Sequence, residues 1–305
     1  MSKMNNRVYG VVGIKSIMSN WNADFTGRCK TTSNGEIFGS DKAFKYPIKK
    51  MWEFTSKDNK VLCVKSYKHE KNEIQPRDLE ERYEQLFNAK LDKNTPKEEI
   101  FNNLFSALDV KNFGATFASK NCNISITGAV QVGQGYNKYK DTKIEVQDIL
   151  SPFRDSTSED AKNSTLGTKT VADEAHYMYP FSVNPQNYDI YKEIYPTGYT
   201  TEDYEKFKTA CLVAATSYNT NSKIGCENEL AIFVECKENS KLYLANLDQY
   251  ITFEKGEDLD KINITKLMEI LNDKIDEIEN IEIYYNKYTT ELIGCNEKCT
   301  VKSLY

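Results

Sequence analysis

Lys42, Lys45 and Lys49 recur at the spacing that places side chains on one face of a helix. Ser40 is a suitable N-cap, so the sequence predicts a short basic helix over residues 41–54. Three cations on one helix face repel one another unless an anion lies nearby. This face is therefore the strongest indication in the chain of a surface that binds phosphate groups.

The loop before this helix, residues 19–39, is long and rich in Asn, Gly and Thr. Long loops beside a compact strand are commonly functional. Trp21 lies near the start of the loop, between Asn20 and Asn22. We expect its ring to be exposed there, where it could stack on a base or pack against the protein.

A second polar stretch, residues 128–135, combines glycines with Gln131 and Gln134. Its spacing does not match a dinucleotide-binding fingerprint, and no helix follows it directly. Its backbone N–H groups and Gln side chains could approach a polymeric ligand. A twisted strand with bulges explains the same pattern equally well.

The sequence contains no recognisable catalytic constellation. His69 and His176 have no Ser or Cys partner in a known motif, and the chain has neither a P-loop nor an HExxH motif. Asp24 and Asp41 bracket the basic loop and could in principle hold a metal against a phosphodiester. Loop hydrogen bonding for Asp24 and helix-dipole complementarity for Asp41 are the plainer roles. We expect a binding protein with no catalytic residue, metal or cofactor.

The eight cysteines are mostly scattered singly, which predicts buried free thiols in a reducing compartment. Only Cys295 and Cys299 lie close together, and no second Cys or His pair follows to complete a zinc site. No apolar run approaches the roughly 20 residues that cross a bilayer. We expect a cytoplasmic protein without membrane contact.

Charge is unevenly distributed along the chain. The formal net charge is −5, yet residues 1–52 carry nine Lys and Arg against three Asp and Glu. Residues 251–290 carry ten Asp and Glu against five Lys. This asymmetry suggests a basic working face and an acidic back, although ordinary solvated faces explain the charge runs equally well.

Residues 136–175 are polar and irregular, with strand-like flanks at 143–149 and 176–183. This pattern predicts a hairpin-like arm that projects from the body. Phe153 and Leu166 have no evident core to join within it. On an arm they could wedge between stacked bases or pack on a neighbouring subunit.

The remaining periodicity predicts strands and helices that alternate around one antiparallel sheet. Helices are expected over 77–90, 96–108, 200–218 and 264–281, the third opened by a Thr200/Asp203 capping box. Strands are expected over 8–17, 61–67, 230–235, 241–253 and 281–288. We expect one α+β domain over 1–305, of the ferredoxin-like, RNA-recognition type, with a helical insertion over 70–110.

Four stretches then suggest a family. They are RVYGVVGIKSIMSNWNADFTG, GSDKAFKYPIKKMW, NFGATFA with ITGAVQVGQGY, and HYMYPFSVNP, in this order within residues 5–255. Together they resemble the backbone subunit of type I CRISPR Cascade, the Cas-seven family, and are most similar to its type I-B branch. Any one motif is weak, but four in order are fairly specific.

The resemblance implies a hand-shaped protein with an RNA-recognition palm, helical fingers and a long thumb. Copies would polymerise along a guide crRNA without sequence preference, each thumb folding over the next segment and kinking it. The crRNA bases between kinks would pair with target DNA. Partners would be crRNA, target DNA, further copies and other Cascade subunits, with cleavage left to a recruited helicase-nuclease.

The resemblance also assigns residues. The RNA-binding positions it implies are Asn20, Trp21, Asn22, Lys42, Lys45, Lys49, Gln131 and Gln134, and it places the thumb at 136–175 with Phe153 and Leu166 as kink candidates. Related type III backbone subunits cleave bound target RNA with a loop Asp, so cleavage by Asp24 is the alternative. The type I motifs argue against it. Replacing the three lysines with Glu is expected to abolish RNA binding and to leave the fold intact.

Overall fold

The computed structural model describes residues 2–70, 72–154 and 164–305. Nine strands of this part of the chain form a central sheet, in which the order β16-β14-β11-β1-β10-β8-β2 is extended by β7 and β9, both paired with β10. The strands are β1 (Val8–Ser19), β2 (Phe38–Gly39), β7 (Val130–Val132), β8 (Gly135–Asn137), β9 (Ile144–Arg154), β10 (Ser164–Val183), β11 (Cys226–Cys236), β14 (Ile278–Tyr285) and β16 (Thr300–Ser303).

The expected α+β class is confirmed, but the sheet is mixed and not purely antiparallel. Its central strand β1 is antiparallel to both β10 and β11. The last strand, β16, runs parallel to β14. Strand β16 was not predicted, because Thr300–Ser303 is short and mostly exposed. It forms by pairing with β14, which its own residues do not indicate.

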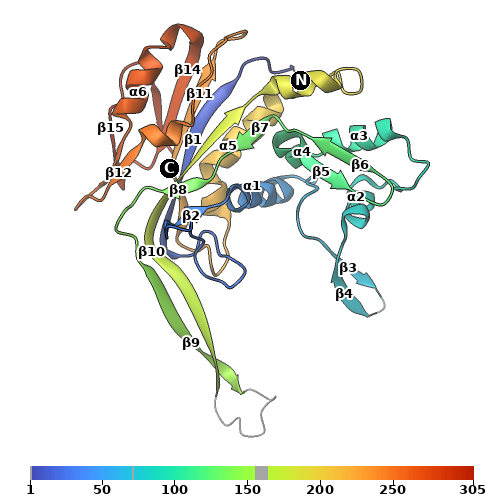
Figure 1. Ribbon diagram of the computed structural model, residues 1–305, viewed down its shortest axis with the longest axis horizontal. Helices are drawn as coiled ribbons and strands as arrows, with labels where there is room; N and C mark the ends of the chain where they lie inside the picture. The colour runs from blue at the N-terminus through green and yellow to red at the C-terminus, as the bar shows by residue number, and fades with distance from the viewer. Residues whose placement is uncertain (1, 71, 155–163) are drawn as a thin grey trace.

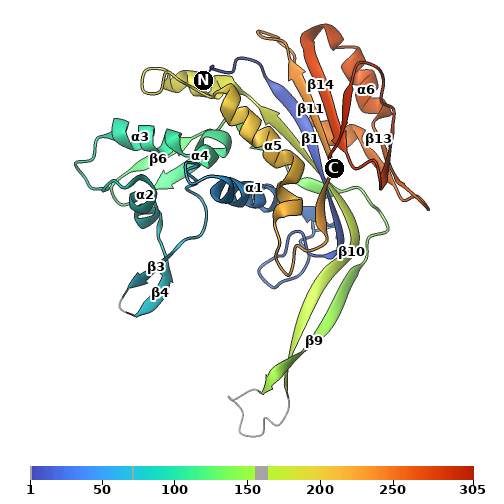
Figure 2. The same cartoon turned by 180° about the vertical axis from the view of Figure 1, so that it is seen from behind.

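Helices cover both faces of the sheet (Figures 1 and 2). Helices α1 (Asp41–Thr55) and α5 (Thr201–Ser217) pack on one face, together with Val8, Val12 and Ile14 of β1. Helix α6 (Thr265–Asn272) packs on the other face beside Val11, with a small sheet of β12 (Thr252–Glu254), β13 (Asp260–Asn263) and β15 (Thr290–Ile293). Because both faces are covered, bases cannot stack on the sheet itself.

The helix starts agree with the sequence prediction. The Ser40 hydroxyl accepts a hydrogen bond from the Ala43 N–H at 3.3 Å and so caps α1. Thr200 and Asp203 form both hydrogen bonds of a capping box at the start of α5. These caps fix where each helix begins, and therefore which side chains face the sheet.

Residues 67–126 form a side unit next to α1 (Figure 1). It consists of β3 (Tyr67–Glu70), β4 (Glu73–Pro76), α2 (Leu79–Phe87), α3 (Lys97–Ser106), α4 (Leu108–Phe113), β5 (Ala115–Ala118) and β6 (Asn123–Ile126). The strand predicted over 61–67 is wrong. The N–H groups of Leu62 and Cys63 donate to the Asp109 carboxylate at 2.8 Å each, so this segment pairs with a side chain and not with a strand.

Strands β9 and β10 form a long antiparallel hairpin that leaves the body, as the strand-like flanks predict (Figure 2). Strand β10 is continuous from this hairpin into the centre of the sheet, since its end pairs with β1 through Val183. The hairpin is therefore anchored in the core by one of its own strands.

The C-terminal region departs from the prediction. Residues 241–253, expected as a strand, are mostly irregular and include the 3-10 turn η2 (Leu247–Tyr250). The helix expected over 264–281 ends at Asn272, and the 3-10 turn η3 (Ile275–Glu277) leads into β14. Ile281 and Ile283 are buried where β14 pairs with β11, so tertiary pairing overrides the helical periodicity. No helix of the described residues is both long and apolar enough to cross a membrane.

Candidate nucleic-acid interface

The three lysines of α1 lie together, as their spacing predicts. With Tyr46 and Cys63 they line a hollow of about 290 Å³. Lys45 is paired with Asp41 at 2.9 Å and Lys49 with Asp109 at 3.6 Å. Lys42 is exposed and has no carboxylate partner in the described part of the chain. Lys42 is therefore the cation of this face whose charge is most available to a ligand.

Lys49 has a structural role that spacing alone did not reveal. Its partner, Asp109, has a fully buried side chain and also accepts the N–H groups of Leu62 and Cys63. A Glu at position 49 would place a second carboxylate beside this buried one, at a large energetic cost. We therefore expect Glu at all three lysines to destabilise the fold, in place of the sequence-based expectation that the fold stays intact.

Replacing Lys42 or Lys49 with neutral Gln should affect the stability of the protein differently. Lys49→Gln is expected to lower the free energy of unfolding by about 1–3 kcal/mol, because the buried Asp109 carboxylate loses its cation. Lys42→Gln is expected to change it by less than about 0.5 kcal/mol, because Lys42 is exposed. Urea unfolding measures both, and equal stability of the two variants would contradict the role assigned to Lys49.

Trp21 is not exposed, which corrects the sequence prediction. Its relative exposure is 0%, and its indole N–H donates to the Tyr179 hydroxyl at 2.6 Å. Phe44 of α1 stacks on the same Tyr179 ring, with centroids 4.9 Å apart. The backbone turns inward directly after β1, so the indole fills the core between the sheet and α1. Trp21 positions the loop and cannot stack on a ligand in this conformation.

Asn20 and Asn22 also hold the loop. The Asn20 amide donates to the carbonyls of Gly27 and Thr170 at 3.2 and 3.1 Å. The Asn22 side-chain oxygen accepts the Ser40 N–H at 2.7 Å, which ties the loop to the start of α1. Asn20 is buried, whereas Asn22 is partly exposed. Of the two, Asn22 is the one that a ligand can reach.

The aromatic side chain that the loop exposes is Phe25, at 100% relative exposure. Arg28, three residues later, is also exposed. The sequence analysis passed over both. The available signal was the position of Phe25 between Asp24 and the Thr26-Gly27 turn, where an apolar residue has no core to enter. The loop therefore exposes one aromatic ring, Phe25, and one cation, Arg28.

Gln131 and Gln134 do not lie on the same side of the structure. Gln134 lies close enough to Asp41, the ion-pair partner of Lys45, to affect the pKa of that carboxyl. Burial acts to raise the pKa of Asp41, but Lys45 and then Gln134 leave this pKa below its ordinary value. Gln131 lies on the opposite, α6 side of the sheet, where it lines a groove with Tyr9. Only Gln134 adjoins the lysine face.

Asp24 shapes its own loop. One carboxylate oxygen accepts the Thr26 N–H at 2.8 Å, the Thr26 hydroxyl at 2.7 Å and the Arg28 N–H at 3.0 Å. Hydrogen bonds from Thr26, and then from Arg28, hold the pKa of Asp24 below its ordinary value. The plainer role of loop hydrogen bonding is confirmed for this residue.

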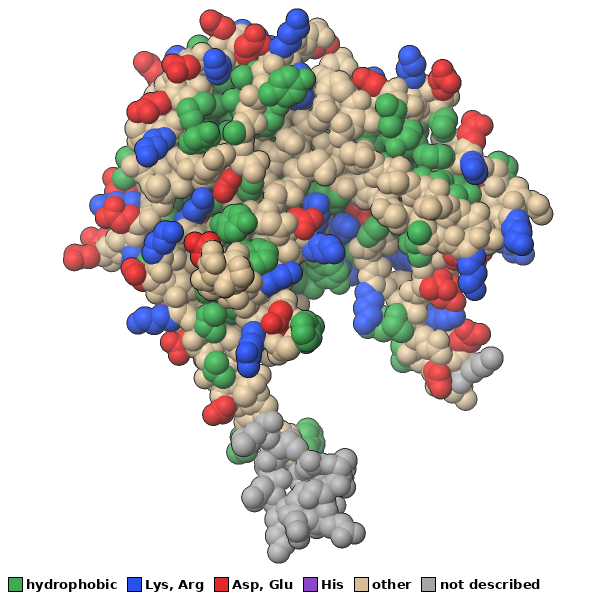
Figure 3. Space-filling model, in the orientation of Figure 1, with side chains coloured by type: hydrophobic (Ala, Val, Ile, Leu, Met, Phe, Trp, Pro, Cys, Tyr) green, Lys and Arg blue, Asp and Glu red, His purple; other side chains and the backbone are tan. Residues whose placement is uncertain are grey.

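The hairpin exposes apolar side chains along β9. Phe153 is 76% exposed and Leu150 is 69% exposed. Leu166 lies opposite Leu150 in the backbone register, but its side chain falls outside the described residues. Figure 3 shows a hollow between the hairpin and the β3–β4 projection, with Lys and Arg side chains gathered along its inner edge. A polymer in this hollow would pass the α1 lysines and the root of the hairpin.

Comparison with known proteins gives the family. The model of the family described as "CRISPR-associated protein Cas7" matches residues 6–283, which is most of the chain. The chain belongs to the Cas7 family.

One solved structure agrees with this chain at the level of the fold, and a second is also similar to it. A chain of a "CRISPR RNA-guided surveillance complex, pre-nicking" is similar over 98% of this chain and 96% of its own, with a TM-score of 0.56 and 13% identity. A chain of a "CRISPR RNA-guided surveillance complex" is similar over 94% of this chain and 95% of its own length, with a TM-score of 0.48 and 13% identity. No curated protein matches the chain.

This Cas7-family chain also contains a buried charge cluster that the sequence analysis missed. His176, fully buried in β10, lies between Glu229 at 2.7 Å and Glu174 at 3.3 Å, and stacks on Phe253. Burial acts to lower the pKa of His176, but the two carboxylates leave it above its ordinary value. The interaction could not be read from the sequence, because Glu229 lies 53 positions away.

The raised pKa of His176 predicts how the stability of the protein depends on pH. A histidine whose pKa is higher in the folded state stabilises the fold fully below its unfolded value of about 6.5, and this contribution is lost as pH rises through the folded value. The native protein is therefore expected to lose stability as the pH rises above about 6.5. Thermal unfolding of His176→Gln should show a smaller loss over this range, and an identical profile would contradict the assignment.

Proposed function

We propose that this chain is the RNA-binding backbone subunit of a type I CRISPR surveillance complex, of the I-B kind. The observation that carries the proposal is the exposed Lys42 on α1, which has no carboxylate partner in the described part of the chain. The loop before α1 adds the exposed Phe25 and Arg28. Lysine and arginine side chains bind phosphates irrespective of base identity, and an exposed ring accepts any base. Such a surface tracks a guide strand without reading its sequence.

The arrangement of the body supports a palm. The strand order β11-β1-β10 with β7 and β8 beyond, and α1 and α5 together on one face, is that of a ferredoxin-like, RNA-recognition fold. In this proposal residues 1–305 are one domain, 70–110 are its fingers and 136–175 its thumb. The β9–β10 hairpin reaches over guide RNA held by the next copy, and other subunits and target DNA join the assembly.

The chain acts in this proposal by holding RNA, without cutting it. The contacts of Asp24 support this, since the three hydrogen bonds that its carboxylate accepts all shape the loop. Incubation of the bound guide or a complementary RNA with divalent metal tests it. Cleavage that disappears in Asp24→Ala would replace the holding role with that of a nuclease.

Binding of a guide RNA tests whether α1 belongs to the RNA interface. Lys42→Glu is expected to weaken binding of a guide RNA about tenfold and to reduce its dependence on salt, because a phosphate contact is lost. Lys266→Glu, an equal charge change on the exposed side of α6, is the matched control and should bind normally. Unchanged binding by Lys42→Glu would remove α1 from the interface.

A further inference from the structure

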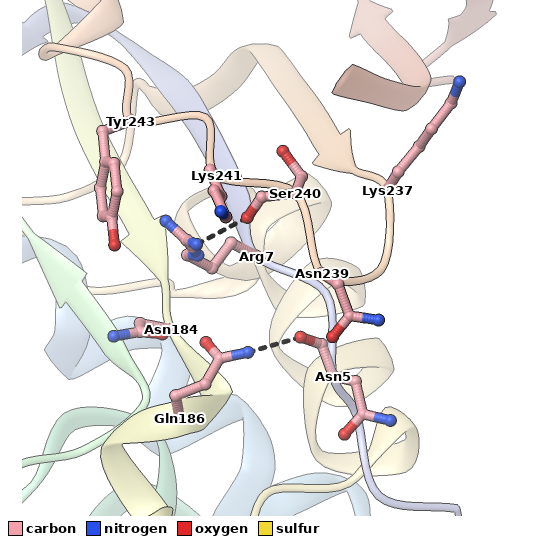
Figure 4. A pocket seen from close by; sticks show the side chains of 9 residues that line it. All are labelled: Asn5, Arg7, Asn184, Gln186, Lys237, Asn239, Ser240, Lys241 and Tyr243. Atoms are coloured by element: carbon pink, nitrogen blue, oxygen red, sulfur yellow. Dashed lines mark hydrogen bonds between the residues drawn. The ribbon is translucent and has the colours of Figure 1, made fainter. Parts of the chain in front are cut away.

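A cavity of about 440 Å³ lies at the other end of β1, away from the loop and from the exposed side of α1. Three segments build it: the chain before β1, the start of the 3-10 turn η1 (Pro185–Tyr191), and the loop after β11 (Figure 4). Its volume is within the range of about 300–1,000 Å³ that is usual for small-ligand sites. Its lining includes Arg7, Lys237 and Lys241 but no Asp or Glu.

Arg7 is held in place by groups that leave its charge unneutralised. Its guanidinium donates to the carbonyls of Ser240 at 2.7 Å and Leu242 at 3.2 Å, and lies 4.3 Å from the centre of the Tyr243 ring. Within the described ranges no carboxylate lies within ion-pair distance of it. A fixed cation without an anionic partner is suited to an anionic ligand.

Two nearby lysines add to this positive charge, and two carboxylates lie close by without lining the cavity. Lys237 and Lys241 are both exposed, and neither forms an ion pair with a described residue. The closest acids in sequence, Glu235 and Glu238, accept hydrogen bonds from Asn6 and Asn5 at 2.5 and 2.9 Å. In Figure 4 Lys241 lies beside Arg7, while Lys237 extends from the rim. The cavity therefore has three cationic groups around its opening.

Tyr243 adds an apolar surface to these charges. Its side chain is 78% exposed, with the Arg7 guanidinium over its ring. Such a ring can stack with a planar group, and its stacked cation strengthens the interaction. Asn184 also lines the cavity, and its amide N–H donates to Asn187 at 2.9 Å. Cation and ring together fit a phosphate attached to a base.

We propose that this cavity binds a nucleotide unit of a single nucleic-acid strand, separately from the guide held at α1. A phosphate lies between Arg7 and Lys241, and its base stacks on Tyr243. A strand is favoured over a free nucleotide because Lys237 lies outside the main group of side chains, where a neighbouring phosphate would pass. The cavity contains no residue of α1, so the proposed strand binding can be tested independently of the proposed guide binding.

The test uses the full chain and a fluorescein-labelled oligo(dA) of about 12 nucleotides, in the range of single-strand site sizes. All variants are made in the Lys42→Glu protein, so that binding at α1 is already weakened. In this protein Tyr243→Ala is expected to weaken oligo(dA) binding at least about fivefold, because the stacking on the Tyr243 ring is lost. Lys237→Gln with Lys241→Gln should reduce the slope of log affinity against log salt by about 1.4. The controls are Tyr288→Ala, at 68% exposure, and Lys266→Gln, which should both bind as the background does.

Photo-crosslinking locates the strand and separates the two proposals. A crosslink at Tyr243 that persists in Lys42→Glu supports the cavity, whatever happens to guide binding. Guide binding at α1 with no effect of the cavity variants overturns the cavity alone. Displacement of the oligonucleotide by an equal concentration of AMP would assign a free nucleotide, and equal displacement by polyglutamate an acidic protein surface. Either result overturns the proposed strand.

Discussion

Trp21→Ala is expected to lower the free energy of unfolding by about 3–5 kcal/mol, the range found when a buried large aromatic is truncated. The indole is completely buried and donates to Tyr179, so its removal leaves a cavity and an unpaired hydroxyl in the core. The loop over residues 19–39 would lose its attachment to β10. Chemical unfolding monitored by circular dichroism measures the change.

Phe25→Ala is the matched control, because Phe25 is a fully exposed aromatic in the same loop. Its stability is expected to stay within about 0.5 kcal/mol of the native protein. Its RNA binding is expected to fall about five- to a hundredfold if its ring stacks on a base. A stable Trp21→Ala that has lost RNA binding would restore Trp21 as the stacking residue and exclude the packing described here.

These two residues show what the sequence could and could not predict. The loop was identified from turn residues that act locally, and the capped helix after it from a local spacing. The α1 lysines share a face for the same local reason. Whether an aromatic ring in a polar loop points inward depends on a partner that is distant in sequence, and Tyr179 lies 158 positions from Trp21. Exposure was therefore assigned to the wrong ring.

The roles of the α1 lysines were also hard to predict, because they depend on a residue that is distant in sequence. Lys42, Lys45 and Lys49 are equivalent in the sequence, and nothing in their spacing separates a ligand contact from a structural ion pair. Asp109 makes the distinction, because its carboxylate is buried next to Lys49 and not next to Lys42. The same carboxylate replaces a strand partner for Leu62 and Cys63, so a single residue accounts for both errors.

The C-terminal third was predicted least well, for a related reason. Its apolar residues suit a helix and a strand equally by spacing, and the choice is made by the open edge of β11. The covered second face of the sheet follows from this choice, because α6 and the small sheet pack where a typical RNA-recognition domain offers its strands to bases. Bases therefore cannot stack on this face of the sheet, which is why the proposed guide binding uses α1 and the hairpin.

Leu150→Ser combined with Phe153→Ser is expected to abolish assembly of copies along a long RNA. Both side chains lie on the hairpin and are mostly exposed, at 69% and 76%, and neither belongs to one of the two core clusters. Burying two such side chains on a neighbouring copy contributes at least about 3 kcal/mol, or about a hundredfold per contact. The proposed contact between copies would not survive this loss.

The readouts distinguish assembly from folding and from single-site binding. Thermal stability and binding to an RNA long enough for one copy should stay near native values, because neither side chain belongs to a core cluster. Sedimentation on a long RNA should change from cooperative arrays to scattered single copies. Ile190→Ser with Ile224→Ser, at 77% and 63% exposure on other parts of the surface, should assemble normally. Cooperative arrays formed by the hairpin variant would show that copies meet through other surfaces, and the β9–β10 hairpin would then lose its role as a thumb.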